Sequence, residues 1–255
     1  MIFYFSATGN SKYAAEKFAS ALNDKSVDLT ECIKNNAFDF TLNESAPLGL
    51  VFPTYCFGLP ILVIDFLERL NLRFDKKPYC FCAVTYGSSV GQAGRRANEI
   101  LQDKNLSFNA YFSVKMPDTW TPLFDLSNID KVQKILSRSE KEIDYAISLL
   151  KKQATGDFMR AKTPNFISKL YYKTYENKRK TSHLHVENTC IGCGRCVKDC
   201  PSAAIRINGK KPIWIKPRCT MCLSCLHHCP KFAIQYDNKT KNHGQYDRTD
   251  FNLTK

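Results

Sequence analysis

Two stretches in the last third of the chain carry most of its cysteines at spacings suited to metal binding. Eight of the twelve cysteines lie in residues 190–201 and 219–230. Each stretch follows the pattern C-x2-C-x2-C-x3-C-P, in which three thiols lie close along the chain and a fourth precedes a proline. Thiolates are soft ligands that suit iron–sulfur clusters, and four of them complete the ligand set of a [4Fe–4S] cluster. The eight cysteines therefore predict two such clusters.

Zinc and disulfide bonds are the alternatives for these cysteines. A zinc ribbon uses two well-separated C-x2-C pairs with four ligands for each metal, which does not account for the third and fourth cysteine of each stretch. Disulfides are typical of secreted chains, and the short apolar start at residues 1–6 is not the pattern of a signal peptide. We therefore favour iron–sulfur clusters and expect a cytoplasmic protein.

The two stretches closely resemble those of bacterial two-cluster ferredoxins. In that family the fourth cysteine of each stretch ligates the cluster of the other stretch. The likeness extends beyond the ligands, because Cys-Pro-x-x-Ala-Ile occurs at both 200–205 and 229–234. The resemblance implies two ligand sets, which are Cys190, Cys193, Cys196 and Cys229 for one cluster and Cys219, Cys222, Cys225 and Cys200 for the other.

A second chemical motif lies near the N-terminus, between an apolar run at residues 2–5 and a helical pattern that follows residue 11. Its side chains are mostly hydroxyls and an amide: Ser6, Thr8, Gly9, Asn10 and Ser11. A loop at a helix N-terminus presents unpaired backbone N–H groups and the positive end of the helix dipole, which favour a phosphate. The loop matches neither the Walker A nor the G-x-G-x-x-G pattern. Taken alone, it is also compatible with an ordinary capped strand–helix turn.

Apolar runs alternate with helical patterns through residue 155. We expect strands at 26–31, 48–52, 79–85 and 108–114, and a long closing helix over 129–150. This alternation favours an α/β fold with a doubly wound parallel sheet, in which ligands bind at the carboxyl ends of the strands. Loops rich in Gly, Ser, Thr and Tyr follow two of these strands. They are expected to meet the N-terminal loop at one edge of the sheet.

The N-terminal loop resembles the [ST]-x-T-G-N-[ST] phosphate-binding loop of flavodoxins, which implies that it binds the phosphate of FMN. By this resemblance the loops at 53–58 and 85–91 flank the flavin ring. The residues implied are Pro53, Thr54, Tyr55, Gly58, Thr85, Tyr86 and Gly87. Tyr55 and Tyr86 are the candidates for stacking on the ring, unless they are rim or core aromatics. Both loops lack the tryptophans of the best-known flavodoxins, and Trp120 is a further candidate to cover the ring edge.

Several residues beside these motifs are expected to have no cofactor role. Cys56 is interpreted as an ordinary thiol, although it lies in a flavin loop, and Cys80 and Cys82 as small buried side chains. The basic run at 178–180 is expected to be a solvated face, and the histidines at 227–228 to be exposed.

The net charge of +13 is concentrated in the C-terminal part. It is +1 for residues 1–155, +5 for 156–185 and +7 for 186–255. Such a surface favours an acidic redox partner, and the absence of a nucleic-acid-binding motif disfavours nucleic acid. No apolar run approaches the roughly 20 residues that a membrane span needs.

These observations divide the chain into four parts. They are a flavodoxin-like FMN-binding domain at 1–155, a basic connection at 156–185, a small α+β two-cluster ferredoxin domain at 186–237, and a polar tail at 238–255 that is expected to fray. This order is similar to that of flavodoxin–ferredoxin fusion proteins, often called EFR-type ferredoxins. The resemblance implies an electron-transfer protein that couples FMN to the two clusters. A flavin-dependent oxidoreductase that reduces a small acceptor and a flavin-free docking module for a ferredoxin remain the alternatives.

Overall fold

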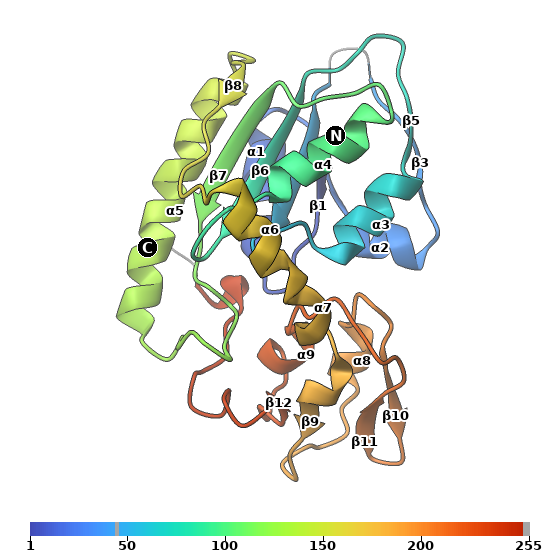
Figure 1. Ribbon diagram of the computed structural model, residues 1–255, viewed down its shortest axis with the longest axis vertical. Helices are drawn as coiled ribbons and strands as arrows, with labels where there is room; N and C mark the ends of the chain where they lie inside the picture. The colour runs from blue at the N-terminus through green and yellow to red at the C-terminus, as the bar shows by residue number, and fades with distance from the viewer. Residues whose placement is uncertain (44–45, 252–255) are drawn as a thin grey trace.

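A computed structural model describes residues 1–43 and 46–251 and shows two domains joined by a helical connection (Figure 1). The N-terminal domain is built on a six-stranded parallel sheet with the order β2-β1-β4-β6-β7-β8. Its strands are β1 (Ile2–Tyr4), β2 (Ser26–Asp28), β4 (Leu48–Pro53), β6 (Cys80–Tyr86), β7 (Ala110–Lys115) and β8 (Gly156–Asp157). The sheet confirms the flavodoxin-like α/β fold predicted from the alternating pattern.

Five helices cover the two faces of this sheet. They are α1 (Asn10–Ala21), α2 (Leu29–Lys34), α3 (Ile61–Arg69), α4 (Ala93–Gln102) and α5 (Ile129–Leu150). Helices α1 and α5 pack on one face, and α2, α3 and α4 pack on the other. Successive strand residues alternate between the two cores: Phe3 and Leu50 face α3 and α4, whereas Ile2 and Val51 face α1 and α5. Burial on both faces explains why the strands read as continuous apolar runs.

The expected strand at residues 26–31 is only partly correct. It ends at Asp28, whose side chain accepts a hydrogen bond from the backbone N–H of Thr30 at 2.7 Å. This is the geometry of a helix N-cap, so the chain enters α2 where a strand was expected to continue. A separate parallel pair, β3 (Asp39–Thr41) and β5 (Asn71–Arg73), was not predicted.

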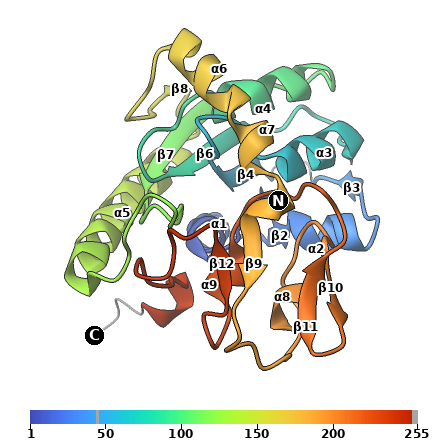
Figure 2. The ribbon, with the colours of Figure 1, turned by 60° about the horizontal axis from the view of Figure 1, so that its bottom comes forward.

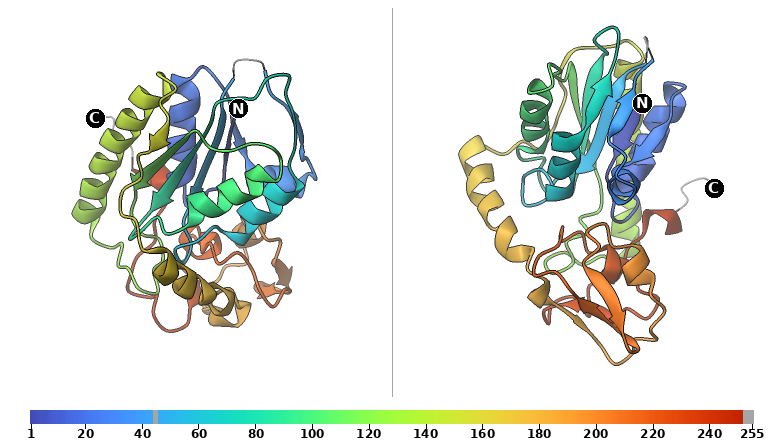
Figure 3. Two further views of the ribbon diagram at one scale, coloured as in Figure 1. Left: turned by 45° about the horizontal axis from the view of Figure 1, so that its top comes forward. Right: turned by 90° about the vertical axis from the view of Figure 1, so that its right-hand side faces the viewer.

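The connection is folded. After β8 it forms α6 (Asn165–Lys173), α7 (Tyr175–Lys178) and a 3-10 turn, η1 (Thr181–His183). Figure 3 shows α6 and α7 passing along one side of the molecule between the two domains. Tyr175 is almost fully buried, and its hydroxyl donates to the Thr220 carbonyl at 2.8 Å. The connection therefore packs against both domains.

The C-terminal domain consists of short antiparallel strands and two one-turn helices. Strands β9 (Leu184–Val186) and β12 (Ile234–Tyr236) form one pair, and β10 (Ile205–Asn208) and β11 (Lys211–Trp214) form another. Helices α8 (Arg195–Lys198) and α9 (Ser224–His227) each begin within a cysteine stretch. The equivalent positions of α8 and α9 match the duplication seen in the sequence.

The tail does not fray over the residues that the structure describes. Residues 238–251 return to the N-terminal domain, where a second 3-10 turn, η2 (Arg248–Asp250), lies beside α1 and α5 (Figure 2). Tyr246 is buried in the core under α5, and Arg248 is 4% exposed. The expectation was wrong because the tail gains an aromatic anchor, Tyr246, and an ion pair at 3.0 Å between the buried Arg248 and the partly exposed Glu140. Residues 252–255 lie outside the described part of the chain.

Within residues 1–43 and 46–251, the helices are too short or too polar to cross a membrane.

Candidate functional site

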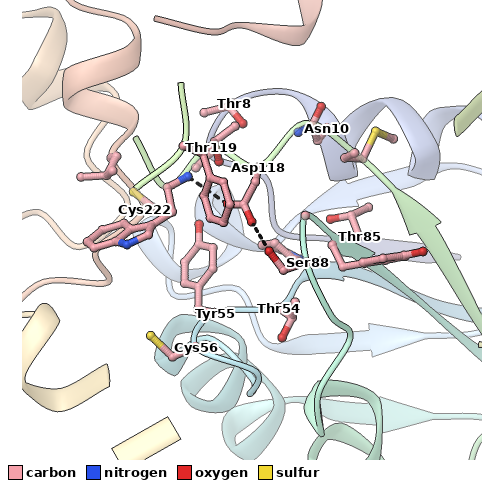
Figure 4. Close-up of a pocket in the computed structure, with 18 of the residues that line it drawn as sticks. Thr8, Asn10, Thr54, Tyr55, Cys56, Thr85, Ser88, Asp118, Thr119 and Cys222 are labelled. Atoms are coloured by element: carbon pink, nitrogen blue, oxygen red, sulfur yellow. Dashed lines mark hydrogen bonds between the residues drawn. The ribbon is translucent and has the colours of Figure 1, made fainter. Parts of the chain in front are cut away.

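A cavity of about 300 Å³ opens at the carboxyl ends of β1, β4 and β6. It is bounded by the loops that follow these strands and by the loop between β7 and α5. Its far wall comes from the connection and the C-terminal domain (Figure 4). The fold thus brings the three predicted loops to one site, as expected for a parallel sheet.

The loop after β1 supplies hydroxyl groups to the cavity. Gly9 has φ of 85° at the N-cap of α1, a left-handed conformation that favours glycine. Ser11 donates to or accepts from Thr85 at 2.7 Å between their side-chain oxygens. The Ser6 hydroxyl is buried, lines the cavity and has no hydrogen-bond partner among the described residues. A buried hydroxyl without a partner is costly, and a phosphate oxygen would satisfy it, so this loop fits the phosphate of FMN.

Asn10 in the same loop is held from two sides. Its carbonyl oxygen accepts a 2.6 Å hydrogen bond from the Tyr246 hydroxyl in the tail, and its amide lies 3.4 Å from the carbonyl of Pro117. The tail also donates the backbone N–H of Arg248 to the carbonyl of Thr8, at 2.9 Å. The tail therefore supports the phosphate loop from outside the cavity, a contact between residues 236 positions apart.

The loop after β4 is a tight turn. Tyr55 and Gly58 exchange two backbone hydrogen bonds of 2.9 Å, and the two residues between them, Cys56 and Phe57, have φ of 50° and 63°. Positive φ at both central positions of a two-residue turn defines a type I′ turn, which normally favours glycine or asparagine. The turn places the Tyr55 ring in the cavity wall. Pro53, Thr54 and Cys56 line the cavity as well, whereas Gly58 packs beneath the ring of Tyr172.

The loop after β6 approaches an acidic side chain that was not predicted. Tyr86 and Gly87 line the cavity together with Asp118, which follows β7. The Asp118 carboxylate accepts hydrogen bonds from the Ser88 hydroxyl at 3.0 Å and the Trp120 N–H at 3.2 Å. Burial raises the pKa of this carboxyl above its usual range, although these two hydrogen bonds oppose the shift. The sequence signal was a lone aspartate after an expected strand, which is too common to single out.

The connection closes the cavity with a cation. The ammonium of Lys178 lies 3.0 Å from the Tyr171 hydroxyl and 3.7 Å from the sulfur of Cys56, and it faces the ring of Trp120 at 5.8 Å. The expectation of a solvated face at residues 178–180 was therefore wrong for Lys178. Periodicity could not reveal this, because the position of α7 depends on long-range packing through Tyr175.

The eight cysteines of the two stretches gather in two separate small cavities. The outer cysteine site contains Cys190, Cys193, Cys196 and Cys229, and the inner cysteine site contains Cys200, Cys219, Cys222 and Cys225. Each site therefore combines three cysteines of one stretch with the fourth of the other. Two clusters that exchange fourth ligands between the stretches, as the ferredoxin resemblance implies, would need this grouping.

Backbone groups around the sulfurs repeat between the two sites. The N–H of Ala204 donates to the Cys200 sulfur at 3.3 Å, and the N–H of Ala233 donates to the Cys229 sulfur at 3.2 Å. Such N–H donors stabilise negative charge on a thiolate. Within the described residues, no group of three or more His, Cys, Asp or Glu side chains is close enough to hold a single metal ion. Thiols spread around a cavity suit the corners of an iron–sulfur cube, so the donor set fits a cluster at each site.

The inner cysteine site adjoins the cavity at the carboxyl ends of β1, β4 and β6, which we call the flavin cavity after the cofactor that the resemblance implies. Met221, Cys222 and Leu223 line the cavity, and the same three residues line the inner site. Figure 4 shows Cys222 across the cavity from Asp118, with Tyr55 close by. Burial raises the pKa of the Cys222 thiol, so iron would have to displace its proton on binding. The spacing predicts that Cys222 is a cluster ligand, but only the fold shows that it also lines this cavity.

The two histidines before Cys229 are buried or half-buried, whereas they were expected to be exposed. His227 is buried, and it links Thr119 at the cavity to the tail: Nε2 lies 2.9 Å from the Thr119 carbonyl, and Nδ1 accepts the Tyr246 N–H at 3.2 Å. Burial lowers the pKa of His227 to about 4. His228 is half-buried between the carboxylates of Asp199 and Asp247, each 3.2 Å away. Burial opposes its charged form, but these carboxylates raise its pKa overall.

Comparison with solved structures found several distant similarities. Among solved structures, the chain is similar to the Trp repressor binding protein from Bacillus subtilis, with 15% identity and a TM-score of 0.38 over 61% of this chain and 100% of that one. It is also similar to rubredoxin oxygen:oxidoreductase from Desulfovibrio gigas, with 15% identity and a TM-score of 0.33 over 58% and 36% of the two chains. An azoreductase from Bacillus anthracis gives 12% identity and a TM-score of 0.36 over 59% and 98%.

A search of curated protein sequences found no match. Two family descriptions match the chain directly. The flavodoxin domain matches residues 1–145, and the 4Fe-4S dicluster domain matches residues 183–230. The first match covers more than half of the chain and coincides with the parallel sheet and its helices, while the second covers most of both cysteine sites. This chain therefore belongs to the flavodoxin domain family and carries a 4Fe-4S dicluster ferredoxin domain fused to its C-terminal side.

Proposed function

We propose that this protein transfers electrons between an FMN in the cavity and two [4Fe–4S] clusters, and exchanges them with a redox partner that has an acidic docking surface. One observation carries the proposal: Cys222 lines both the flavin cavity and the inner cysteine site. A ligand shared in this way would bring a cluster to the wall of the flavin site. A flavin can accept one or two electrons and a cluster accepts one, so the pair can collect or split electron pairs.

In this proposal the chain's own residues bind and orient the flavin. Ser6, Thr8, Ser11 and the backbone at Gly9 would hold the phosphate at the N-terminus of α1, with Asn10 held in position by the tail. Pro53, Thr54, Tyr55, Thr85, Tyr86 and Gly87 would flank the ring. Gly58 would act indirectly, through the type I′ turn that it closes with Tyr55.

Buried apolar side chains would keep water out of the space between the two centres. Met221 and Leu223 are 7% and 3% exposed, and both lie beside Cys222 in the cavity wall. Little reorganisation of solvent is then needed when charge moves, and the protein controls potential through fixed dipoles and hydrogen bonds. The Lys178 ammonium at the cavity would stabilise negative charge that builds up on the ring.

The test is to purify the protein anaerobically and to quantify iron, sulfide and FMN. The proposal expects eight irons, eight sulfides and one FMN per chain, as two [4Fe–4S] clusters and one flavin require. Ser6→Ala should lower FMN occupancy and leave the irons in place. A protein that retains its irons but never binds FMN would support the flavin-free docking module instead.

A second function is favoured by one unpredicted residue. Asp118 places a carboxyl of raised pKa in the flavin cavity, where it could deliver a proton to a small acceptor reduced by the flavin. In that case Asp118→Asn would slow reduction of a small quinone and leave electron transfer to a redox protein unchanged. Equal rates for the quinone in both proteins would exclude this role.

We also propose that the protein works in a reducing, cytoplasmic setting. All twelve cysteines are free thiols in the structure. Eight of them lie in the cluster sites and Cys80 and Cys82 are buried in the sheet, as expected for reduced cysteines.

A further inference from the structure

We propose that the surface around the outer cysteine site is the docking site of the redox partner. This surface, the outer face, consists of Ile191, Arg195, Ile207, Lys210 and Lys231. It would receive an acidic redox protein whose own redox centre lies close to its surface. The inference rests on the proposed function and adds to it the place of docking and the order of the centres, which is flavin, inner cluster, outer cluster, partner.

The two cysteine sites differ in their access to solvent. At the outer site Cys193 is exposed, and Cys190, Cys196 and Cys229 are half-buried. At the inner site Cys200 and Cys225 are buried, whereas Cys219 and Cys222 are half-buried and Cys222 faces the flavin cavity. The inner site therefore lies between the flavin cavity and the outer site on the proposed electron path. The outer site is the more exposed of the two, so a partner's centre can approach it more closely.

The outer face has an apolar centre. Ile191 and Ile207 line the outer site and are 62% and 37% exposed. Large apolar side chains left in solvent beside a functional centre are typical of a protein interaction surface. Two isoleucines make a small patch, and small patches suit the brief encounters of redox proteins, whose interfaces lie at the low end of the size range.

Basic side chains surround this centre. Residues 186–237 contain eight Lys and Arg and three carboxylates: Glu187 and Asp237 near the two ends of the domain and, between them, Asp199. Arg195 and His228 already bind that carboxylate, at 3.3 Å and 3.2 Å. Among the residues that the structure describes, neither Lys210 nor Lys231 takes part in an ion pair with a side chain of the C-terminal domain, and Lys231 lines the outer site. The face therefore presents uncompensated positive charge.

The hairpin that carries Lys210 is fixed against the outer site. A Cβ atom on Gly192 would lie only 2.8 Å from the Lys210 carbonyl oxygen, so the turn between β10 and β11 packs directly on the first cysteine loop. Lys211 in the same hairpin bonds the Asn188 side chain at 2.9 Å. These contacts fix the backbone of Lys210 next to the site, and its side chain is exposed there. An apolar centre with a basic rim is complementary to a partner that surrounds its redox centre with carboxylates.

The experiment uses the anaerobically prepared holoprotein and an acidic rubredoxin as the probe. Zero-length carbodiimide cross-linking, which joins lysine to carboxylate, is followed by peptide mass spectrometry. Stopped-flow spectroscopy separately measures the second-order rate of rubredoxin reduction at several salt concentrations. The test variant is Lys210→Glu/Lys231→Glu. The matched control is Lys134→Glu/Lys151→Glu, which makes the same change in net charge at exposed lysines on and beside α5.

Cross-links at Lys210 or Lys231, together with a rate that falls with salt, are expected. The outer-face variant should be slower by about tenfold or more, and the control close to wild type, because local charge steers the encounter. Equal slowing in both variants would show that only net charge matters and would overturn the proposal. Cross-links confined to α6 or to the flavin cavity rim would overturn it as well, by placing docking elsewhere.

The proposed function has a separate readout in the same samples. Electron equilibration between flavin and clusters inside one chain should be unchanged in the Lys210→Glu/Lys231→Glu variant, since neither lysine lines the flavin cavity. If the wild-type protein shows no electron equilibration between flavin and clusters, the proposed function is contradicted. The cross-links would still show where the rubredoxin binds.

Discussion

Replacing Tyr246 with phenylalanine should weaken FMN binding although this tyrosine does not line the cavity. Its hydroxyl donates a 2.6 Å hydrogen bond to the Asn10 side chain in the phosphate loop, and the residue is 2% exposed. Removing the hydroxyl leaves the Asn10 oxygen without this donor in a buried place. Such a loss costs about 1–3 kcal/mol in the free energy of unfolding.

Some of this lost free energy should appear as weaker FMN binding, because the hydrogen bond from Tyr246 holds Asn10 in the position that the phosphate loop needs. If about 1–2 kcal/mol is lost in the bound state alone, the dissociation constant of FMN rises roughly 5- to 30-fold. Fluorescence titration of FMN into flavin-free protein measures it, and thermal denaturation of the same samples measures stability.

Tyr79→Phe is the matched control. Tyr79 is a partly buried tyrosine just before β6, at the opposite end of the sheet from the cavity, and its hydroxyl donates to the Ala154 carbonyl at 2.6 Å. It should lower stability with little effect on FMN affinity. Unchanged FMN affinity in Tyr246→Phe, with a loss of stability like that of the control, would refute the idea that the tail organises the phosphate site.

Three further predictions concern residues around the cavity. Lys178→Met should lower the flavin reduction potential by about 20–40 mV for the two-electron couple, because about 1–2 kcal/mol of charge stabilisation is lost. Lys178→Arg keeps the charge and should largely preserve the potential. Spectroelectrochemistry measures both variants, and an unchanged potential in Lys178→Met would count against a role for this cation. The raised pKa of Asp118 means that the flavin-free folded state holds its proton more tightly than the unfolded chain, so its contribution to stability is present below pH 4 and lost as the pH rises through the folded pKa. Asp118→Asn should therefore raise the melting temperature at pH 7 more than at pH 4. A larger increase at pH 4 than at pH 7 would show that the hydrogen bonds to the Asp118 carboxylate stabilise it more than burial destabilises it. Gly58→Ala should destabilise the protein by about 1–3 kcal/mol or more, because the new Cβ would lie 2.1 Å from the ring of Tyr172 on α6. Thermal denaturation measures this loss. A melting temperature equal to that of the wild type would show that α6 can move away without cost.

The local motifs were readable from the sequence because their chemistry lies within short segments. The spacing of Cys190, Cys193 and Cys196 and the loop from Ser6 to Ser11 each place several ligating groups within one turn of backbone. The parallel sheet was equally predictable, since strands buried on both faces must be apolar throughout. The boundary errors, such as the start of α2 at Leu29, came from an N-cap that competes with strand extension.

The remaining parts of the site depend on contacts between segments far apart in the chain. Lys178 reaches the cavity only because Tyr175 anchors α7 between the two domains, and Tyr246 reaches Asn10 only because the tail turns back after β12. The placement of Cys222 at the flavin cavity follows from the docking of one domain on the other. No local pattern of hydrophobicity or propensity encodes these contacts, so the sequence alone predicts a frayed tail and a solvated basic run.

The central claim is that the flavin and the inner cluster exchange electrons within one chain. The most direct measurement is laser photoreduction of the flavin in the anaerobic holoprotein, with flavin and cluster absorbance followed together. The flavin should be reoxidised as the clusters bleach, with a first-order rate constant that does not change when the protein is diluted. A rate proportional to protein concentration, or a flavin that remains reduced while the clusters remain oxidised, would contradict the account.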